Sequence, residues 1–215
     1  MAHITPETKS KGVRTMAANF SESRTKENLM RAFAGESQAR NRYTIAAKKA
    51  DDEGMHTIAD IFRYTAEQER AHAERYYDLL KNLAGESIRI DGIYPVDLQD
   101  DLAGLLRAAE HNEHEEYEDV YQAFGDTASD EGFHEAASAF YQIAEVEHVH
   151  EKRFARLAKL LEEDSYYGSG DVDKWICTNC GYIHEGNQAP KYCPVCRYEQ
   201  GYFLPYEFAC YKGEN

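Results

Sequence analysis

The segment IAEVEHVHEKRF, residues 143–154, places a carboxylate and an imidazole on the helix face that should be buried. Apolar residues recur there at three- and four-residue steps, and Glu147 and His150 fall on the same stripe. A buried carboxylate needs a compensating cation or a hydrogen-bond network. A metal supplies that charge most directly, and Glu-x-x-His is the inward-facing pair of dimetal bundles. A core histidine satisfied by a neighbouring carboxylate is the alternative explanation for one such pair.

The pattern occurs twice in the chain, in register. DDEGMHTIADIF, residues 51–62, resembles SDEGFHEAASAF, residues 129–140, and the same offset aligns Glu69 with Glu147 and His72 with His150. Two copies are too few to bury the core of a solenoid. The sequence therefore predicts a closed, pseudo-symmetric bundle of two helical hairpins.

Three further glutamates interrupt apolar stripes. Glu36 does so in a first helix, which we expect to start at Thr25 as N-cap and to end before Gly54. Glu113 and Glu116 have apolar neighbours three and four residues away in a later helix. The expected helices cover residues 25–53, 55–83 and 98–127, with a fourth ending near residue 163. The histidines interpreted as surface groups are His111, His114 and His148.

The alignment of the third helix on the first suggests a local irregularity. The offset that pairs Tyr43 with Tyr121 sets Glu36 against the residue after Glu113. A one-residue insertion between Glu113 and Tyr121 reconciles both matches. Such an insertion is a π-bulge, and π-bulges concentrate at functional sites. We therefore predict a π-bulge in this helix.

The C-terminal part contains two C-x-x-C knuckles separated by twelve residues, Cys177 with Cys180 and Cys193 with Cys196. This spacing is a strong signal for a tetrahedral four-thiolate site. Disulfides are the alternative, but a cytosolic chain keeps its thiols reduced. Cys210 has no partner spacing, and we interpret it as a buried or spare thiol.

Charge and hydropathy exclude some classes of partner. The formal net charge of −15 argues against nucleic acid, whose phosphates would repel the surface. No apolar run reaches transmembrane length, and the N-terminal residues lack the apolar core of a signal peptide. We therefore expect a soluble cytoplasmic protein without a membrane or nucleic-acid partner.

Several motifs together resemble the rubrerythrin family. They are FAGESQARNRY at residues 33–43, the EQERAH run ending at His72, the EHEEY run starting at Glu113, EHVHEKRF at residues 147–154, and CxxCGY followed by CPxC. The resemblance implies a mainly α protein, a ferritin-like four-helix bundle followed by a small rubredoxin-like domain of strands and loops. The expected parts are a flexible tail (1–22), the bundle (23–164), a linker (165–173) and the rubredoxin-like domain (174–215).

The resemblance also implies two metal sites. The expected diiron ligands are Glu36, Glu69, His72, Glu113, Glu116, Glu147 and His150. The four knuckle cysteines would hold a mononuclear iron, although four thiolates alone do not specify iron over zinc. Five glutamates and two histidines exceed the ligand complement of the simplest dimetal bundles. Glu116 and His72 are therefore expected to exchange on one iron as its oxidation state changes, which the resemblance also implies.

Peroxide reduction fits this set of expected metal ligands. Two ferrous ions supply the electrons that cleave an O–O bond, while Glu69 and Glu147 bridge the pair. Tyr43, Tyr117 and Tyr121 are candidates for orienting peroxide, although an aromatic residue at helical spacing is more often part of a core. The resemblance implies a peroxidase that reduces hydrogen peroxide to water in oxidative-stress defence. Electrons would come from a reductase or rubredoxin and pass through the four-cysteine iron.

Two other functions remain open at this point, an iron-oxidising or iron-binding ferritin-like protein and a helical scaffold with a structural zinc ribbon. Helix length also bears on electron transfer. At the helical rise, His150 lies about 20 Å from the expected linker, whose composition gives no sign of a fixed docked path. We therefore expect a head-to-tail homodimer, as the rubrerythrin family forms, or a higher oligomer.

Overall fold

The computed structural model describes residues 19–168, 170 and 172–211. Most of the expected N-terminal tail lies outside these residues. Its last part forms a short 3-10 helix, η1 (Phe20–Glu22), whose Phe20 ring packs edge-on against Phe133 with centroids 5.2 Å apart. Residues 20–22 therefore belong to the end of the bundle rather than to a flexible tail.

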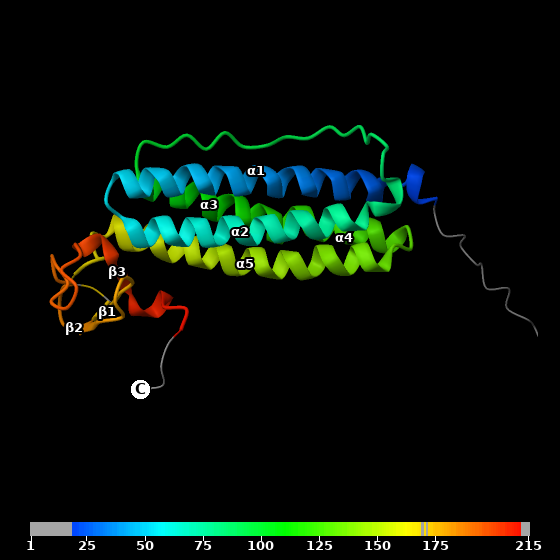
Figure 1. Cartoon of the computed structure of the whole chain (residues 1–215). Coiled ribbons are helices and arrows are strands. Elements are labelled where there is room, and N and C mark those ends of the chain that lie inside the picture. The colour runs from blue at the N-terminus through cyan, green and yellow to red at the C-terminus, as the bar shows by residue number, and fades with distance from the viewer. Residues whose placement is uncertain (1–18, 169, 171, 212–215) are drawn as a thin grey trace, which may run out of the picture.

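Long helices form the predicted bundle, with the cysteine-containing region at one end (Figure 1). Two hairpins make it, and α1 and α2 form the first while α3, η3 and α4 pack against α5 in the second. The bundle elements are α1 (Arg24–Asp52), α2 (His56–Leu79), η2 (Lys81–Leu83), α3 (Leu102–Glu115), η3 (Glu116–Val120), α4 (Tyr121–Asp130) and α5 (His134–Glu162). This architecture confirms the predicted fold class.

The two hairpins turn in the same way, as the sequence repeat predicts. Gly54 and Gly132 adopt left-handed backbone conformations, with φ of 74° and 85°. Each glycine N–H donates to a carbonyl three residues earlier, Gly54 to Asp51 over 2.9 Å and Gly132 to Ser129 over 3.0 Å. Glycine adopts this conformation without the steric cost of a Cβ, and it ends both leading helices at equivalent places.

Two helix starts differ from the prediction. Ser23, not Thr25, caps α1, because its hydroxyl accepts from the Lys26 N–H at 3.1 Å while Thr25 donates to Glu131 over 2.6 Å. The helix expected from residue 98 begins at Leu102, where the Asp101 carboxylate accepts from the Gly104 N–H at 2.7 Å. In both cases a capping side chain fixes the start.

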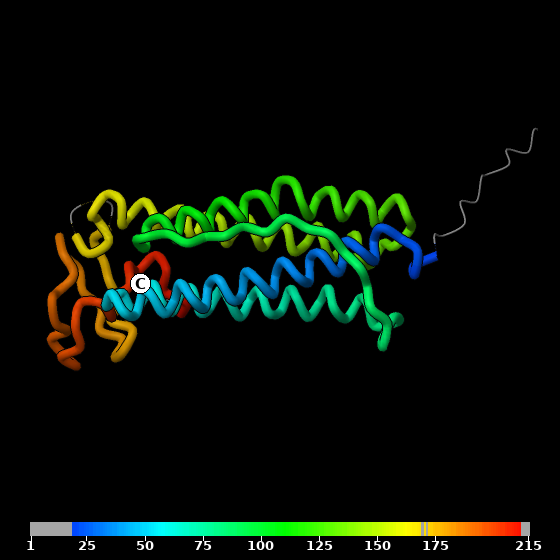
Figure 2. The backbone as a smooth tube through the Cα atoms, turned by 90° about the horizontal axis from the view of Figure 1, so that it is seen from above, coloured from blue at the N-terminus to red at the C-terminus, as the bar shows by residue number. Residues whose placement is uncertain are grey.

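Residues 84–101 form the predicted crossing connection, here called the strap. It runs along the length of the bundle and lies over the groove between α1 and α3 (Figures 1 and 2). Asn112 on α3 donates to Asp97 of the strap over 2.7 Å, and Tyr94 donates to the Arg31 carbonyl over 3.1 Å. The strap is thus anchored on both helices that it covers.

The helix after α3 contains the predicted irregularity. Residues Glu116–Val120 form a π-helix, η3, between Glu113 and Tyr121. The extra residue shifts the register so that Tyr121, like Tyr43 in α1, points into the bundle and is buried. The π-bulge prediction is confirmed.

The C-terminal region forms a three-stranded antiparallel sheet in the order β2-β1-β3. It contains β1 (Lys174–Cys177), β2 (Ile183–Glu185), β3 (Phe203–Pro205) and the short helices η4 (Gln200–Tyr202) and η5 (Tyr206–Phe208). The sheet packs at the end of the bundle beside the turn between α1 and α2 (Figure 1). A Cβ on Gly201 would lie 1.9 Å from the Gly54 carbonyl oxygen, so the two backbones touch there.

Several described residues of the segment expected to be a linker pack against other parts of the chain. Tyr166 is buried, its hydroxyl lies 2.8 Å from the Thr57 hydroxyl, and its carbonyl accepts from the Trp175 indole at 2.9 Å. Ser165 and Val172 are also buried. The composition gave no sign of this packing, because contacts of Tyr166 with α2 and β1, rather than local composition, produce it.

Two hydrophobic clusters lie along the bundle and leave a polar section between them. The first joins the cysteine-containing end to Tyr43, Phe62 and Phe154, and the second contains Tyr76 and Phe140 at the far end. Side chains in the polar section are therefore enclosed by apolar layers. Among the described residues, none of the helices combines the length and the apolar character that a membrane-spanning helix requires.

Candidate metal centres

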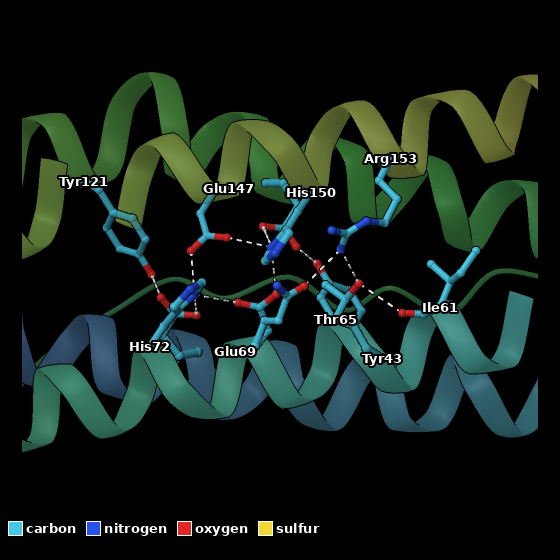
Figure 3. A network of polar contacts seen from close by, with 12 residues as sticks. Tyr43, Ile61, Thr65, Glu69, His72, Tyr121, Glu147, His150 and Arg153 are labelled. Atoms are coloured by element: carbon cyan, nitrogen blue, oxygen red, sulfur yellow. Dashed lines mark hydrogen bonds and ion pairs between the residues drawn. The ribbon is translucent and has the colours of Figure 1, made fainter. Parts of the chain in front are cut away.

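Six of the seven predicted diiron ligands meet in the polar section, in two overlapping groups. Glu36, Glu69, His72 and Glu147 form one group, and Glu69, Glu113, Glu147 and His150 form the other. Within each group the ligand atoms lie within 4.8 Å of one another. Glu69 from α2 and Glu147 from α5 belong to both groups, and Figure 3 shows them facing each other between the histidines. They are therefore the two carboxylates that both groups share.

The distances between ligand atoms fit metal coordination. His72 Nδ1 lies 3.2 Å from Glu69 and 2.9 Å from Glu147, while His150 Nδ1 lies 3.0 Å from Glu69 and 2.8 Å from Glu147. Two ligands at right angles, each about 2.1 Å from one ion, are about 3 Å apart. Each histidine therefore lies at the separation expected for sharing an ion with both carboxylates.

Many of these polar atoms are buried without an aligned hydrogen bond among the described residues. They include both carboxylate oxygens of Glu147, both ring nitrogens of His150, and one oxygen each of Glu36, Glu69 and Glu113. Burial of such atoms without partners is costly. Short contacts without hydrogen-bond alignment arise when lone pairs converge on a common cation, so these residues fit a pair of metal ions.

The pKa shifts of the buried carboxylates agree with a site that binds cations. Burial, followed by repulsion from Glu147 and Glu69, raises the pKa of Glu36 well above its ordinary range. Burial likewise raises the pKa of Glu113 to about 8, with repulsion from Glu69 adding to it. For Glu69, burial is outweighed by the close contacts of its carboxylate with the His150 and His72 rings, which lower its pKa to about 2. Crowded buried carboxylates of this kind need compensating charge.

Two of the three candidate tyrosines hold ligand carboxylates. Tyr121 donates to Glu36 over 2.6 Å, and Tyr43 donates to Glu113. Burial raises the pKa of both phenols well above the ordinary value, so both keep their protons at neutral pH. Tyr117 is different, because its ring stacks on His148 with centroids 4.1 Å apart and no described contact joins it to the ligands. The structure thus brings Tyr43 and Tyr121, but not Tyr117, to the site.

Glu116 is the predicted ligand that lies apart from both groups. It is the first residue of the π-helix, its side chain is half-buried, and Oε1 points toward Gly35 on α1. Burial, together with repulsion from Glu113, Glu147 and Glu69, raises its pKa well above the usual range, and Arg42 opposes this shift. His72, its proposed exchange partner, lies among the ligands.

Sequence reasoning missed two arginines beside the site. Arg153 on α5 donates to Thr65 over 2.9 Å and to Gln68 over 3.1 Å, at the end of the ligand cluster near Tyr43 (Figure 3). Arg42 on α1 lies next to Tyr43 and contacts the strap at Asp97. Both are ordinary members of charged runs, so only the position of Arg42 within FAGESQARNRY could have pointed to it.

The four knuckle cysteines converge at the sheet end. Cys177 and Cys196 have sulfurs 3.7 Å apart, and Cys180 and Cys193 have sulfurs 3.6 Å apart. Four thiolates about 2.3 Å from one tetrahedral ion would be about 3.8 Å apart. All four sulfurs lie within 4.8 Å of one another, so the predicted set fits a single ion. Cys210 is exposed and free, and it lies outside this group.

Tight turns place the two knuckles. Gly181, with φ of 78°, donates its N–H to the Cys177 carbonyl over 2.8 Å. In the second knuckle the Arg197 N–H donates to the Cys193 carbonyl over 2.9 Å. Arg197 has a φ of 67°, an unusual backbone conformation for a residue with a Cβ. A hydrogen bond from Asn179 is the main cause that lowers the pKa of Cys196 to about 6. Burial, by contrast, raises the pKa of Cys177 to about 12, so the low pKa is particular to Cys196.

Comparisons with known proteins agree with both centres. The family model for rubrerythrin matches residues 27–158, and the model for the rubredoxin-like domain of rubrerythrin matches residues 175–204. Rubrerythrin-1 of Clostridium acetobutylicum is 49% identical, over 84% of this chain and 93% of its own length. Rubrerythrin of Clostridium perfringens is 46% identical, also over 84% and 93%.

The fold matches a solved relative over both parts of the chain. A fully reduced, all-ferrous nigerythrin structure aligns with a TM-score of 0.58 and 28% identity, over 94% of this chain and all of that one. The chain therefore belongs to the rubrerythrin family, with a diiron carboxylate site in the bundle and a rubredoxin-like four-cysteine site at its end.

Proposed function

We propose that this protein reduces hydrogen peroxide to water at the diiron site. The observation that carries the proposal is the sharing of Glu69 and Glu147 by two ligand groups in a chain that also has a four-thiolate site. When bound in ferrous form, the iron pair supplies the two electrons that peroxide needs. A protein that only stores iron has no need of the attached thiolate centre, so we favour the peroxidase.

The ligands of the site would be Glu36, Glu69, His72, Glu113, Glu116, Glu147 and His150, with Cys177, Cys180, Cys193 and Cys196 at the second iron. Glu69 and Glu147 would hold the metal pair together throughout turnover. Tyr121 and Tyr43 would fix Glu36 and Glu113 through the hydrogen bonds described above. Their phenol groups, which keep their protons at neutral pH, would be candidate proton donors to bound peroxide. The apolar layers on both sides would exclude bulk water.

We also propose that His72 and Glu116 exchange as ligands. In the geometry found here, His72 Nδ1 is within 3.2 Å of both proposed bridging carboxylates, whereas Glu116 stands aside. Neutral imidazole suits the softer ferrous ion and carboxylate the harder ferric ion. A ferrous site would therefore favour His72 as a ligand, and a ferric site would favour Glu116.

Electrons would reach the diiron site from the cysteine centre of a partner chain. The strands of the cysteine-containing region lie at one end of the bundle (Figure 1), and the Glu and His ligands lie between the two hydrophobic clusters. The helical rise puts about 18 Å between His150 and the end of α5. We therefore propose a head-to-tail homodimer, with a reductase or rubredoxin as the electron source, working in the cytoplasm.

The dimer proposal is tested by subunit mixing. A variant lacking Cys177 and Cys180 is unfolded and reassembled with one lacking Glu69 and Glu147. Activity recovered in the mixed dimer supports transfer between chains. Inactive heterodimers beside an active reassembled parent contradict it.

The peroxidase proposal is tested by steady-state turnover. Purified iron-loaded protein is supplied with NADH, a matching reductase and hydrogen peroxide, and peroxide loss is followed. We expect turnover that depends on both metal centres. Oxygen-driven accumulation of ferric iron without peroxide turnover would instead indicate the ferritin-like alternative.

A further inference from the structure

The strap covers a cavity beside the diiron site. It encloses about 300 Å³ and lies between α1, the strap and the π-helix. The residues that matter here are Gly35 and Arg42 on α1, Tyr94 on the strap, and Glu116. Tyr94 lines the cavity, and its hydroxyl donates to the Arg31 carbonyl over 3.1 Å. The cavity is therefore a defined space that the Glu116 side chain can reach.

The guanidinium group of Arg42 lines this cavity and lacks hydrogen-bond partners among the described residues for part of its N–H groups. Its side chain is 17% exposed, and its Nη1 is buried without a hydrogen-bond partner among the described residues. Its Nε has only an ion-pair contact of 3.4 Å with Asp97, whose Oδ2 already accepts from Asn112 at 2.7 Å. A buried guanidinium N–H without a partner is costly, and a carboxylate is its strongest partner.

Glu116 is a carboxylate near Arg42 that needs a positively charged partner when no metal ion binds it. It lines the same cavity, yet it stands outside both ligand groups. A half-buried carboxylate that leaves a metal ion needs another positive charge nearby. Glu115 also lines the cavity, but it is exposed and lies 3.5 Å from His111 on its own helix. Glu116 is therefore the carboxylate that Arg42 is placed to receive.

We propose that Arg42 is a positioning residue that binds the Glu116 carboxylate in the cavity beneath the strap when Glu116 is not a metal ligand. Glu116 then has two stable positions, one on the metal and one on Arg42. The inference rests on the proposed ligand exchange. It adds that the protein stabilises the released carboxylate through one particular cation. Because reduction releases Glu116, Arg42 raises the midpoint potential of the diiron centre.

The direct test is a crystal structure of the all-ferrous parent protein. We expect a Glu116 oxygen within hydrogen-bond distance of Arg42 Nη1 or Nε. If Glu116 leaves the metal but lies away from Arg42, the inference is overturned while the exchange stands. If Glu116 stays on the metal, both the exchange and the inference are overturned. Peroxide turnover is a separate measurement, so the peroxidase proposal can survive either result.

The second readout is the midpoint potential of the diiron centre, measured by optical titration. We expect Arg42→Gln to shift the reduction equilibrium about tenfold toward the oxidised form, about 59 mV for a one-electron step. Arg42→Lys keeps the charge and should restore at least half of the shift. Arg40→Gln is the matched control, because Arg40 is an exposed arginine on the same helix that pairs with Glu67 at 3.7 Å. It should shift the equilibrium less than threefold.

A double-mutant cycle separates a contact from a general effect of charge. In a Glu116→Gln background, Arg42→Gln should change the reduction equilibrium of the diiron centre by less than twofold, because the carboxylate that Arg42 binds is absent. An unchanged tenfold effect in that background would overturn the inference. Asp97→Asn tests whether Arg42 acts only by holding the strap. A shift as large as that of Arg42→Gln would show that it does, and would likewise overturn the inference.

Discussion

Glu69 and Glu147 each contact both site histidines, at distances between 2.8 and 3.2 Å. They come from α2 and α5, the second helices of the two hairpins, and occupy equivalent places in the sequence repeat. The repeat thus places two carboxylates opposite each other. Two buried carboxylates that face each other repel, so they need positive charge between them.

Replacement of either bridging candidate should prevent diiron loading. We expect Glu69→Ala or Glu147→Ala to lose both bundle metals, because each removes a carboxylate that belongs to both ligand groups. The four-cysteine site should stay filled. Metal analysis with a visible spectrum measures both sites, and Glu86→Ala, in the exposed part of the strap, is the control. Two bundle metals retained in either variant would show that the bridging assignment is wrong.

His72→Ala should separate the two oxidation states. We expect it to bind two ferric ions, because only the ferrous form would use the imidazole. Its reduced form should react with peroxide at least tenfold more slowly than the parent, as stopped-flow absorbance would show. Equal rates in the variant and the parent would show that His72 has only a packing role.

The tyrosines should differ in importance. Tyr43→Phe and Tyr121→Phe each remove the donor to a buried carboxylate, a loss that costs about 1–3 kcal/mol. We expect each to slow peroxide reduction about tenfold or more. Tyr117→Phe is the matched control and should stay within twofold, because Tyr117 stacks on His148. A larger effect at Tyr117 than at Tyr43 would reverse this assignment.

His56 should make docking of the cysteine-containing end depend on pH. Its ring lies 3.1 Å from Asp51 and 3.3 Å from Glu199 of that end. Burial lowers its pKa, but the hydrogen bonds to Asp51 and Glu199 outweigh burial, so the folded pKa is raised above 6.5. The stabilisation is then complete below about pH 6.5 and is lost as pH rises through the raised value.

The fluorescence of Trp175, the only tryptophan in the chain, measures this effect during urea unfolding. We expect His56→Gln to destabilise the protein by up to about 1 kcal/mol at pH 6 and by almost nothing at pH 9. His111→Gln, at an exposed histidine beside Glu115, should show no such trend. A constant difference between parent and His56→Gln across this range would contradict the ion-pair explanation.

The parts of the site that were predictable share one property. Glu36, Glu69, Glu147 and His150 are polar residues on stripes that local periodicity marks as buried, and periodicity is a property of sequence. The π-helix was also predictable, because the repeat supplied an internal reference against which one extra residue could be counted. The Tyr117 orientation was not predictable, since the π-helix changes which face each following residue presents.

The linker and the two arginines show what depends on tertiary contact. Tyr166 is buried because Thr57 and Trp175, from other parts of the chain, meet it. Arg42 becomes unusual only because it is buried beside the strap and its Nη1 has no hydrogen-bond partner in the described part of the chain. No local pattern distinguishes such residues from exposed neighbours like Arg40. Contacts of this kind come from residues distant in sequence and need the folded chain.

The most direct test of the proposed function is an anaerobic titration of the all-ferrous protein with hydrogen peroxide, with zinc in the four-cysteine site. Zinc does not change its oxidation state there, so the absorbance reports the diiron centre alone. We predict complete oxidation at one molecule of peroxide per diiron site, within seconds and without release of oxygen. A site that peroxide leaves ferrous over the same time, while air oxidises it, would contradict the account.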